Sequence, residues 1–318
     1  MPAKKVSSLT IPKKYSLDMD GITQSAIVKF MTCRRLFLFY INKLDVPKSG
    51  WGAMGFGSLF HAMLDRLYKS GKVPERSEIT TWLNEETDIF LADNPMVNMQ
   101  DMEDDLAVIF PLFAGYVNQY GDIDCKKNFV SVEKTYSAPF GQAKLRMKPD
   151  GYFRAENGGL WLMEHKTKSR IDEDGLTLSL GMNFQVLFYF AAAKDYLNEK
   201  KNPVGCLYNI VRKPGLRRGK GETLHEFSNR IEVDISARPE WYYIRQEIAF
   251  TPKDIDQFQK ELKMIIQNIS TALSDKRHMY RNTSACLSPF PCPYLANCAG
   301  DTCEGLVKRE KLFRELDV

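Results

Sequence analysis

Apolar residues recur on one helical face through the first third of the chain. The first such stretch spans residues 22–44, with Thr23 or Ser25 suited to cap its start. Its apolar positions include Ile27, Phe30, Met31, Leu38 and Ile41. A Gly-rich turn, SGWGAMGFG, leads into a second helix that ends at Gly71. Similar patterns predict helices over residues 77–91 and 101–120, so this third is mainly helical.

The pattern changes to a strand-like alternation after residue 128. The expected strands are, in order, residues 129–140, 144–155, 160–167, 204–211, 229–235 and 242–250. Helices are expected over residues 176–197 and from Thr251 to Leu273, where Thr251-Pro252 is a typical helix start. This order of elements predicts an α/β fold with a mixed central β-sheet flanked by helices.

The net charge of +4 does not by itself indicate a nucleic-acid partner, and it is compatible with one if the basic residues cluster. They do so in residues 1–21, which we expect to form a flexible basic arm, and in the loop RKPGLRRGKGE. The loop residues that we expect to follow a phosphate backbone are Arg212, Arg217, Arg218 and Lys220. Solvated basic loops are also common without such a partner.

No apolar run approaches the length of a membrane span, and the first residues, MPAKKVSSLTIPKKY, lack the apolar core of a signal peptide. We therefore expect no membrane partner and a cytoplasmic location. In that reducing compartment the seven cysteines are not expected to form a disulfide framework. Metal binding is then the better explanation for a cluster of cysteines.

Charged residues interrupt the β-hairpin that is expected around Asn157-Gly158. With a three-residue loop centred on Asn157, Asp150 lies opposite Glu164, at the separation of about 5 Å between cross-strand neighbours. A slip of one residue would turn one of the two acids to the other face of the sheet. The two-residue period of a strand places Lys166 on the same face as Glu164, with His165 on the opposite face.

Two carboxylates and an ammonium on one apolar patch suit a divalent cation. Mg²⁺ or Mn²⁺ binds hard oxygen ligands, offsets the repulsion between buried carboxylates and activates water for attack on a phosphate. Lys166 would orient that water or stabilise the charge that develops on the phosphate. A buried ion-pair network of Asp150, Glu164 and Lys166 would explain the hairpin charges equally well.

Pro149-Asp150 followed by Glu164-His165-Lys166 resembles the signature of the PD-(D/E)XK nuclease superfamily. The resemblance implies a restriction-endonuclease-like core and metal-dependent hydrolysis of phosphodiester bonds. It also implies that Asp150 and Glu164 hold the metal ion and that Lys166 acts on the attacking water.

Further elements resemble the RecB-type exonuclease branch of this superfamily. Residues 57–61 match its Gly-x-x-x-His element, which implies that His61 is a further metal ligand. Gln185 and Tyr189 match its Gln-x-x-x-Tyr motif, which implies contact with the DNA backbone near the scissile phosphate. A buried or capping role for His61 and core packing for Tyr189 are the alternatives. Glu133 is either an auxiliary acid or a solvated strand residue.

Four cysteines match the pattern of RecB-type nucleases that carry an iron–sulfur cluster, with one early cysteine and three late ones. They are Cys33, Cys286, Cys292 and Cys298, and the resemblance implies a [4Fe–4S] site that joins the two ends of the chain. Zn²⁺ is the alternative metal, because four thiolates suit it as well. The spacing between Cys286 and Cys292 is wider than in many members, so Cys303 is a possible substitute ligand.

The resemblance implies four segments: a basic arm at 1–21, a helical region at 22–125, the nuclease core at 126–275 and an iron–sulfur segment at 276–318 that packs with Cys33. The expected function is a deoxyribonuclease, most simply an exonuclease on single-stranded DNA or duplex ends, in recombination, repair, phage replication or CRISPR adaptation. Recombination or replication proteins are possible partners. The alternatives are a non-catalytic nucleic-acid-binding subunit and a restriction-type endonuclease.

Overall fold

The structure is a computed structural model that describes residues 9–47, 51–199 and 202–316. Its centre is a mixed five-stranded sheet with the strand order β3-β6-β7-β8-β9. These strands are β3 (Asn128–Val132), β6 (Gly151–Arg154), β7 (Leu160–Lys168), β8 (Gly205–Arg212) and β9 (Tyr243–Ile248). Only β7 and β8 are parallel neighbours within it. The expected α/β fold with a restriction-endonuclease-like core is confirmed.

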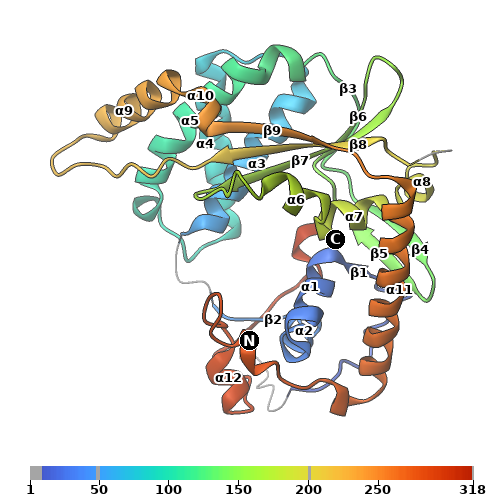
Figure 1. Cartoon of the computed structure of the whole chain (residues 1–318). Helices are drawn as coiled ribbons and strands as arrows, with labels where there is room; N and C mark the ends of the chain where they lie inside the picture. Colours follow the sequence, from blue (N-terminus) through green and yellow to red (C-terminus); the bar gives the residue numbers. More distant parts are fainter. Residues whose placement is uncertain (1–8, 48–50, 200–201, 317–318) are drawn as a thin grey trace.

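Helices cover both faces of this sheet. Successive residues of a strand point to opposite faces, so each face presents its own apolar side chains to the helices that pack on it. Met163 and Leu207 face one apolar core, to which α3, α5 and α9 contribute. Leu162 and Tyr208 face the other core, which includes side chains of α1, α2, α7 and α11. In Figure 1, α5 and α9 lie above the sheet, α3 passes behind it and α7 lies below it.

The three helices predicted after residue 50 are confirmed. They are α3 (Ala53–Ser70), α4 (Arg76–Asp93) and α5 (Glu103–Asp124). Gly71 ends α3 with a left-handed φ of 60°, which glycine adopts without steric cost. The helix begins earlier than expected, inside the stretch predicted as a Gly-rich turn. Among the described residues, no helix is long and apolar enough to cross a membrane.

The helix predicted over residues 22–44 is divided. A short strand, β1 (Ile22–Thr23), precedes α1 (Gln24–Thr32), and Cys33 separates α1 from α2 (Arg34–Ile41). Cys33 has an extended backbone, with φ −161° and ψ 121°, so the helical hydrogen bonding is interrupted there. The break turns the Cys33 side chain toward the C-terminal segment, where its sulfur accepts a hydrogen bond from the Asn282 N–H.

The predicted hairpin register is confirmed. Gly151 pairs with Met163 and Tyr152 with Leu162, and the next position of the same register sets Asp150 opposite Glu164. The strand predicted over residues 144–155 is wrong in length, because it ends at Lys148-Pro149 and resumes as β6. Its first half is β5 (Ala143–Met147), which belongs to a separate sheet with β1 and β4 (Tyr136–Phe140). Proline has no N–H to donate, which favours the break.

Three other predicted elements differ from the structure. Residues 229–235 form part of helix α9 (Leu224–Ala237), not a strand, because a Thr223–Glu226 capping box starts the helix. The helix predicted over 176–197 is three short ones, α6 (Leu176–Gly181), α7 (Phe184–Phe190) and α8 (Ala193–Tyr196). The strand predicted over 129–140 is the pair β3 and β4.

The C-terminal part of the chain returns to the N-terminal part. Helix α10 (Pro239–Tyr242) precedes β9, and the predicted helix after Thr251 is confirmed as α11 (Pro252–Ser274). After α11, short turns and α12 (Leu295–Ala299) lead to β10 (Val307–Lys308), which pairs with β2 (Leu44–Asp45). The described part of the expected arm, residues 9–21, packs on this region, with Leu9 and Leu17 buried.

Candidate metal, cysteine and nucleic-acid sites

Three side chains from separate elements meet beside the Pro149-Asp150 turn. His61 lies on α3, Glu133 directly follows β3, and Asp150 directly precedes β6. One ligand atom from each lies within 4.8 Å of the others, and Nδ1 of His61 is 3.7 Å from Oδ1 of Asp150. An imidazole nitrogen and two carboxylate oxygens at this spacing fit a hard divalent cation.

Glu133 reaches this group because of its backbone. Its φ is 48°, which is unusual for a residue with a side chain, and its N–H donates to the Asp150 carbonyl at 3.0 Å. The Lys148 ammonium lies 3.0 Å from the Glu133 carboxylate. Glu133 is therefore not the solvated strand residue of one alternative, and its place beside His61 and Asp150 was not apparent from its position in the sequence.

Glu164 lies outside that three-residue group, in the fully buried part of β7. The Lys166 ammonium contacts its Oε1, so the two residues share a face of the strand as expected. Its Oε2 is buried and has no partner among the described residues. Since an unpartnered buried carboxylate oxygen is costly, this atom also fits a cation.

Burial controls the ionisation of these groups. It raises the pKa of Asp150 and of Glu164 to about 7 each, and the Lys166 charge opposes the rise in both. Burial also acts on Lys166, but the Glu164 and Asp150 carboxylates hold its pKa above the ordinary value. Burial, followed by the Lys166 charge, lowers the pKa of His61. The imidazole is thus neutral at pH 7, which is the form that binds a metal ion.

The close approach of α3 to β7 places His61. A Cβ atom on Gly57 would lie 3.1 Å from Oγ1 of Thr167, so the absence of a side chain at this position lets the helix pack against the strand. Among the described residues His61 then lines a small pocket with Glu133, Asp150 and His165. The Gly-x-x-x-His spacing therefore has a packing reason as well as a chemical one.

Gln185 and Tyr189 pair with each other on α7. The Gln185 amide donates to the Tyr189 hydroxyl at 2.8 Å, and that hydroxyl donates to the Lys148 carbonyl at 3.3 Å. Tyr189 is 5% exposed. Its contact supports the turn that carries Asp150, so the core-packing alternative and a role at the site are both compatible with its position.

A network of buried polar side chains contacts the His165 side chain, and it was not predicted from the sequence. The Asp124 carboxylate accepts hydrogen bonds from Arg245 and from the Tyr116 hydroxyl. Arg245 also donates to Asn209, whose amide lies 3.3 Å from Nδ1 of His165. The only signal available beforehand was a charged residue inside an apolar strand at Arg245.

The His165 backbone connects this network to the metal group. Its N–H donates to Oδ2 of Asp150 at 2.6 Å, which leaves Oδ1 of that carboxylate toward His61. The His165 side chain points to the opposite face from Glu164, as expected, and stacks on Tyr68 at a centroid distance of 5.4 Å.

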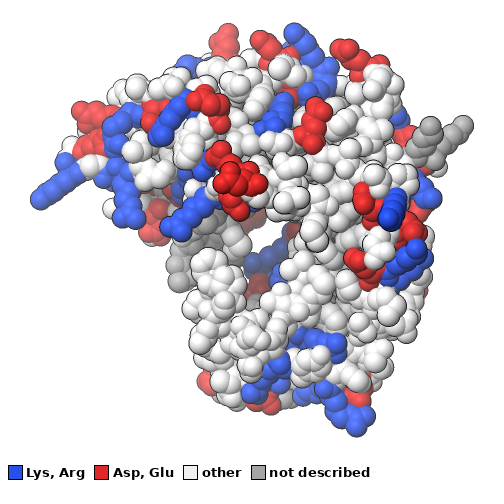
Figure 2. All heavy atoms as spheres, in the orientation of Figure 1, with Lys and Arg blue, Asp and Glu red and all other residues white. Residues whose placement is uncertain are grey.

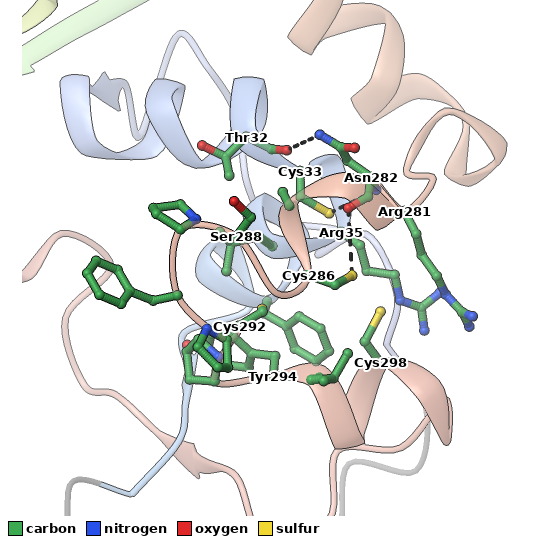
Figure 3. A pocket seen from close by; sticks show the side chains of 18 residues that line it. Thr32, Cys33, Arg35, Arg281, Asn282, Cys286, Ser288, Cys292, Tyr294 and Cys298 are labelled. Atoms are coloured by element: carbon green, nitrogen blue, oxygen red, sulfur yellow. Dashed lines mark hydrogen bonds between the residues drawn. The ribbon is translucent and has the colours of Figure 1, made fainter.

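Four cysteines line one cavity of about 260 Å³ (Figure 3). Cys33 comes from the break between α1 and α2, and the other three, Cys286, Cys292 and Cys298, come from the segment after α11. Among the described residues, no three of these sulfurs lie within 4.8 Å of one another. Cys303 is buried and does not line the cavity.

The basic loop is divided between buried and exposed side chains. Arg212 is 6% exposed, its Nε donates to the Trp241 carbonyl and its guanidinium pairs with Glu173. Arg218 pairs with Asp104, 2.8 Å away. Arg217 and Lys220 are exposed. In Figure 2, Lys and Arg side chains gather at the left, where this loop and α9 project from the body.

A comparison with protein-family models gives a match over most of the chain. The family model of the PD-(D/E)XK nuclease superfamily matches residues 21–299, which include the metal group, α7 and the four cysteines. A comparison with curated proteins finds no match.

Proposed function

Because the chain belongs to the PD-(D/E)XK nuclease superfamily, we propose that it is a metal-dependent deoxyribonuclease that acts as an exonuclease on single-stranded DNA or duplex ends. The observation that carries the proposal is the convergence of His61, Glu133 and Asp150. Oε2 of Glu164, which is buried without a partner among the described residues, adds to it, because a cation would give this oxygen the contact that the ion pair with Lys166 does not supply.

His61, Asp150 and Glu164 are the proposed ligands of Mg²⁺ or Mn²⁺, and Glu133 joins them on the basis of its position. The bound cation would polarise a phosphoryl oxygen and lower the pKa of water. Lys166 keeps its proton at neutral pH, because the neighbouring carboxylates raise its pKa. It therefore serves as a hydrogen-bond donor that orients the attacking water and offsets charge on the phosphate.

Gln185 and Tyr189 are the proposed DNA-contacting and positioning pair. The Tyr189 hydroxyl fixes the Lys148 carbonyl beside Pro149-Asp150, and Gln185, partly exposed, presents its amide next to it. Arg217 and Lys220 are proposed to contact the phosphate backbone, since both side chains are exposed. Arg212 is left out of this surface because its guanidinium is buried and paired.

The test compares two lysines on β7. Lys166→Ala should abolish Mn²⁺-dependent degradation of linear single-stranded DNA, whereas Lys168→Ala, the same substitution at an exposed position of the strand, should leave it intact. Equal activity of both variants, or no cleavage by the unchanged protein, would overturn the proposal and favour a non-catalytic binding subunit. Cleavage of circular duplex at the rate of linear duplex would favour a restriction-type endonuclease.

We propose that Cys33, Cys286, Cys292 and Cys298 hold a [4Fe–4S] cluster. A single Zn²⁺, with Zn–S bonds of about 2.3 Å, would draw its thiolates to about 3.8 Å from one another. In a four-iron cluster each thiolate binds a different iron, so the sulfurs lie farther apart around a central volume. The cavity and the wide sulfur spacing support the larger group.

The cluster proposal is tested on protein purified without oxygen. We expect a brown sample that contains iron, and loss of both colour and iron in Cys292→Ser. The matched control is Cys303→Ser, which should keep the iron because Cys303 does not line the cavity. A colourless sample that contains zinc would refute the iron–sulfur cluster without affecting the metal group at Asp150.

A further inference from the structure

A second pocket, of about 510 Å³, lies apart from the metal group and adjoins the cysteine cavity, with which it shares Thr32, Cys33, Arg281 and Asn282. The end of α1 and the start of α2 form one wall of it, α11 contributes Ile265 and Asn268, and residues 280–283 complete it. Its volume is within the range of sites for small molecules or single nucleotide units. Figure 3 shows the residues from the side of the cysteine cavity, where the Arg281 side chain lies beside that of Arg35.

Two arginines give this pocket a positive charge. Arg34 and Arg281 both line it, and neither has an ion-pair partner in the part of the chain that the structure describes. Other arginines of the same two segments do have carboxylate partners: Arg35 pairs with Asp301, and Arg277 pairs with Asp275. Two guanidinium groups without carboxylate partners attract an anion, and their fork-like geometry suits a phosphate group.

The Arg34 guanidinium is held in a fixed position. It lies 5.0 Å from the centre of the Phe30 ring and 4.6 Å from that of Tyr280, and it donates to the His278 carbonyl at 3.3 Å. A guanidinium fixed by two rings and a carbonyl loses little conformational entropy when it binds a phosphate.

The Tyr280 ring offers a second kind of contact. It is 56% exposed, although it also stacks on Arg34. An exposed ring beside a positive charge can stack on a nucleobase only where the base has left a duplex. Lys276 and Arg277 precede the pocket residues in the sequence, and of these two Arg277 pairs with Asp275.

From these contacts we propose that the pocket binds one nucleotide unit of single-stranded DNA. The phosphate contacts Arg34 and Arg281, Asn268 offers its amide, and the base stacks on Tyr280. The inference rests on the proposed function for its choice of DNA as the strand, and it adds a contact that is separate from the metal group. A strand held here and cut at Asp150 would touch both the sheet and the segment after α11.

The experiment measures binding of a fluorescein-labelled oligothymidylate in a Lys166→Ala background with the cysteine site intact, as judged by its absorbance. Arg34→Gln combined with Arg281→Gln should weaken binding about ten-fold or more and reduce the salt dependence of binding by about one to two phosphate contacts. Tyr280→Leu should weaken binding about five-fold or more through lost stacking. Arg76→Gln, which removes one exposed arginine on α4, is the control for loss of surface charge away from the pocket and should change neither quantity.

Unchanged affinity in both the arginine double variant and Tyr280→Leu would overturn the inference. Equal weakening of binding in Arg76→Gln would overturn it as well. So would displacement of the oligonucleotide by an equal concentration of thymidine monophosphate. If the double variant loses its cluster, Tyr280→Leu and Asn268→Ala decide, because neither replaces a neighbour of Cys33 in the sequence.

Cleavage of bis(p-nitrophenyl) phosphate without the Lys166 substitution separates this inference from the proposed function. This small diester should need the metal group but not the pocket, so the pocket variants should cleave it at the unchanged rate. No cleavage by the unchanged protein would refute the proposed function and leave the binding result valid.

Discussion

The Asp150 carboxylate is positioned by residues that are far from it in the sequence. Asp124 is fully buried and is compensated by Arg245 and Tyr116. Through Asn209 this pair reaches His165, whose N–H fixes one oxygen of Asp150. The orientation of a reacting carboxylate therefore depends on a charge pair on the other face of the sheet.

Arg245→Ala should destabilise the protein by about 3 kcal/mol, because it removes the guanidinium that donates to both oxygens of the buried Asp124 carboxylate and leaves only Lys127, 3.2 Å away, as its cation. Denaturation in urea measures this loss. The control is Lys260→Ala, which removes the partner of Asp256 on the exposed surface of α11 and should change little. Similar losses in both variants would show that the buried pair has no special role.

The two buried acids predict a pH dependence of stability in protein without divalent cations. Burial raises the pKa of Asp150 and of Glu164 to about 7 in the folded protein. Their unfolded values are about 4, so the folded state holds both protons more tightly. The stability that they contribute is complete below about pH 4 and is lost as the pH rises through about 7.

We therefore expect the melting temperature, relative to that of Glu164→Gln, to fall between about pH 4 and pH 7. Mg²⁺ or Mn²⁺ should restore it at the upper end, because a bound cation favours ionised carboxylates. A melting temperature that does not respond to either cation near pH 8 would contradict a metal site at these residues.

At the scale of elements, turns and caps determine where the site residues fall. The β6–β7 hairpin sets Asp150 against Glu164 because Gly158 accepts a φ of 78° in its turn. The break at Cys33 similarly converts one amphipathic stretch into two helices with a cysteine between them. In both cases one residue with a special backbone conformation decides the direction of the chain.

Gly158→Ala should lower stability by about 1 kcal/mol, because alanine is strained at a positive φ. It should also weaken Mn²⁺ binding, measured by calorimetry, since the turn sets the separation of the acids. The control, Gly181→Ala near the end of α6, has open space around it and no positive φ, so it should not destabilise. Equal effects of the two substitutions would refute the role of the turn.

At the scale of the whole molecule, the N-terminal and C-terminal segments bind each other through strand pairing, hydrogen bonds and an ion pair. Strand β10 pairs with β2, and Arg309, which is buried, donates to the Tyr40 carbonyl at 2.6 Å and pairs with Asp45. Glu315 accepts a hydrogen bond from Thr23 at 2.7 Å. These contacts join the two ends of the chain directly, so the ends stay together through hydrogen bonds and ion pairs as well as through any bound cluster.

Arg309→Ala should cost about 2 kcal/mol or more, because it removes a buried guanidinium that donates to the Tyr40 and Leu312 carbonyls and leaves Asp45 with Arg314 as its cation. It should also speed the loss of iron during exposure to air, which absorbance measures. Lys308→Ala, which replaces the adjacent, exposed residue at the end of β10, is the control and should behave like the unchanged protein. Iron loss at the same rate in both variants would show that the contacts between the chain ends do not protect the cluster.

The hairpin register, the end of α3 at Gly71 and the start of α11 at Thr251 were predicted correctly, because each depends on a local period or on one turn or cap residue. Predictions over 176–197 and 229–235 were wrong where local patterns were ambiguous. The alternation of Ile231, Val233 and Ile235 resembles a strand, but the preceding capping box and packing of α9 against α5 make it a helix.

The sequence by itself determined the acids of the hairpin, the face shared by Glu164 and Lys166, and the identity of the four cysteines as a set. Only the tertiary structure decided that Glu133 joins His61 and Asp150, that Arg245 compensates Asp124, and that Arg212 is buried. Local order follows from spacing between near neighbours, which the sequence displays directly. Contacts between distant segments depend on how the helices pack on the sheet, and no local pattern encodes that packing.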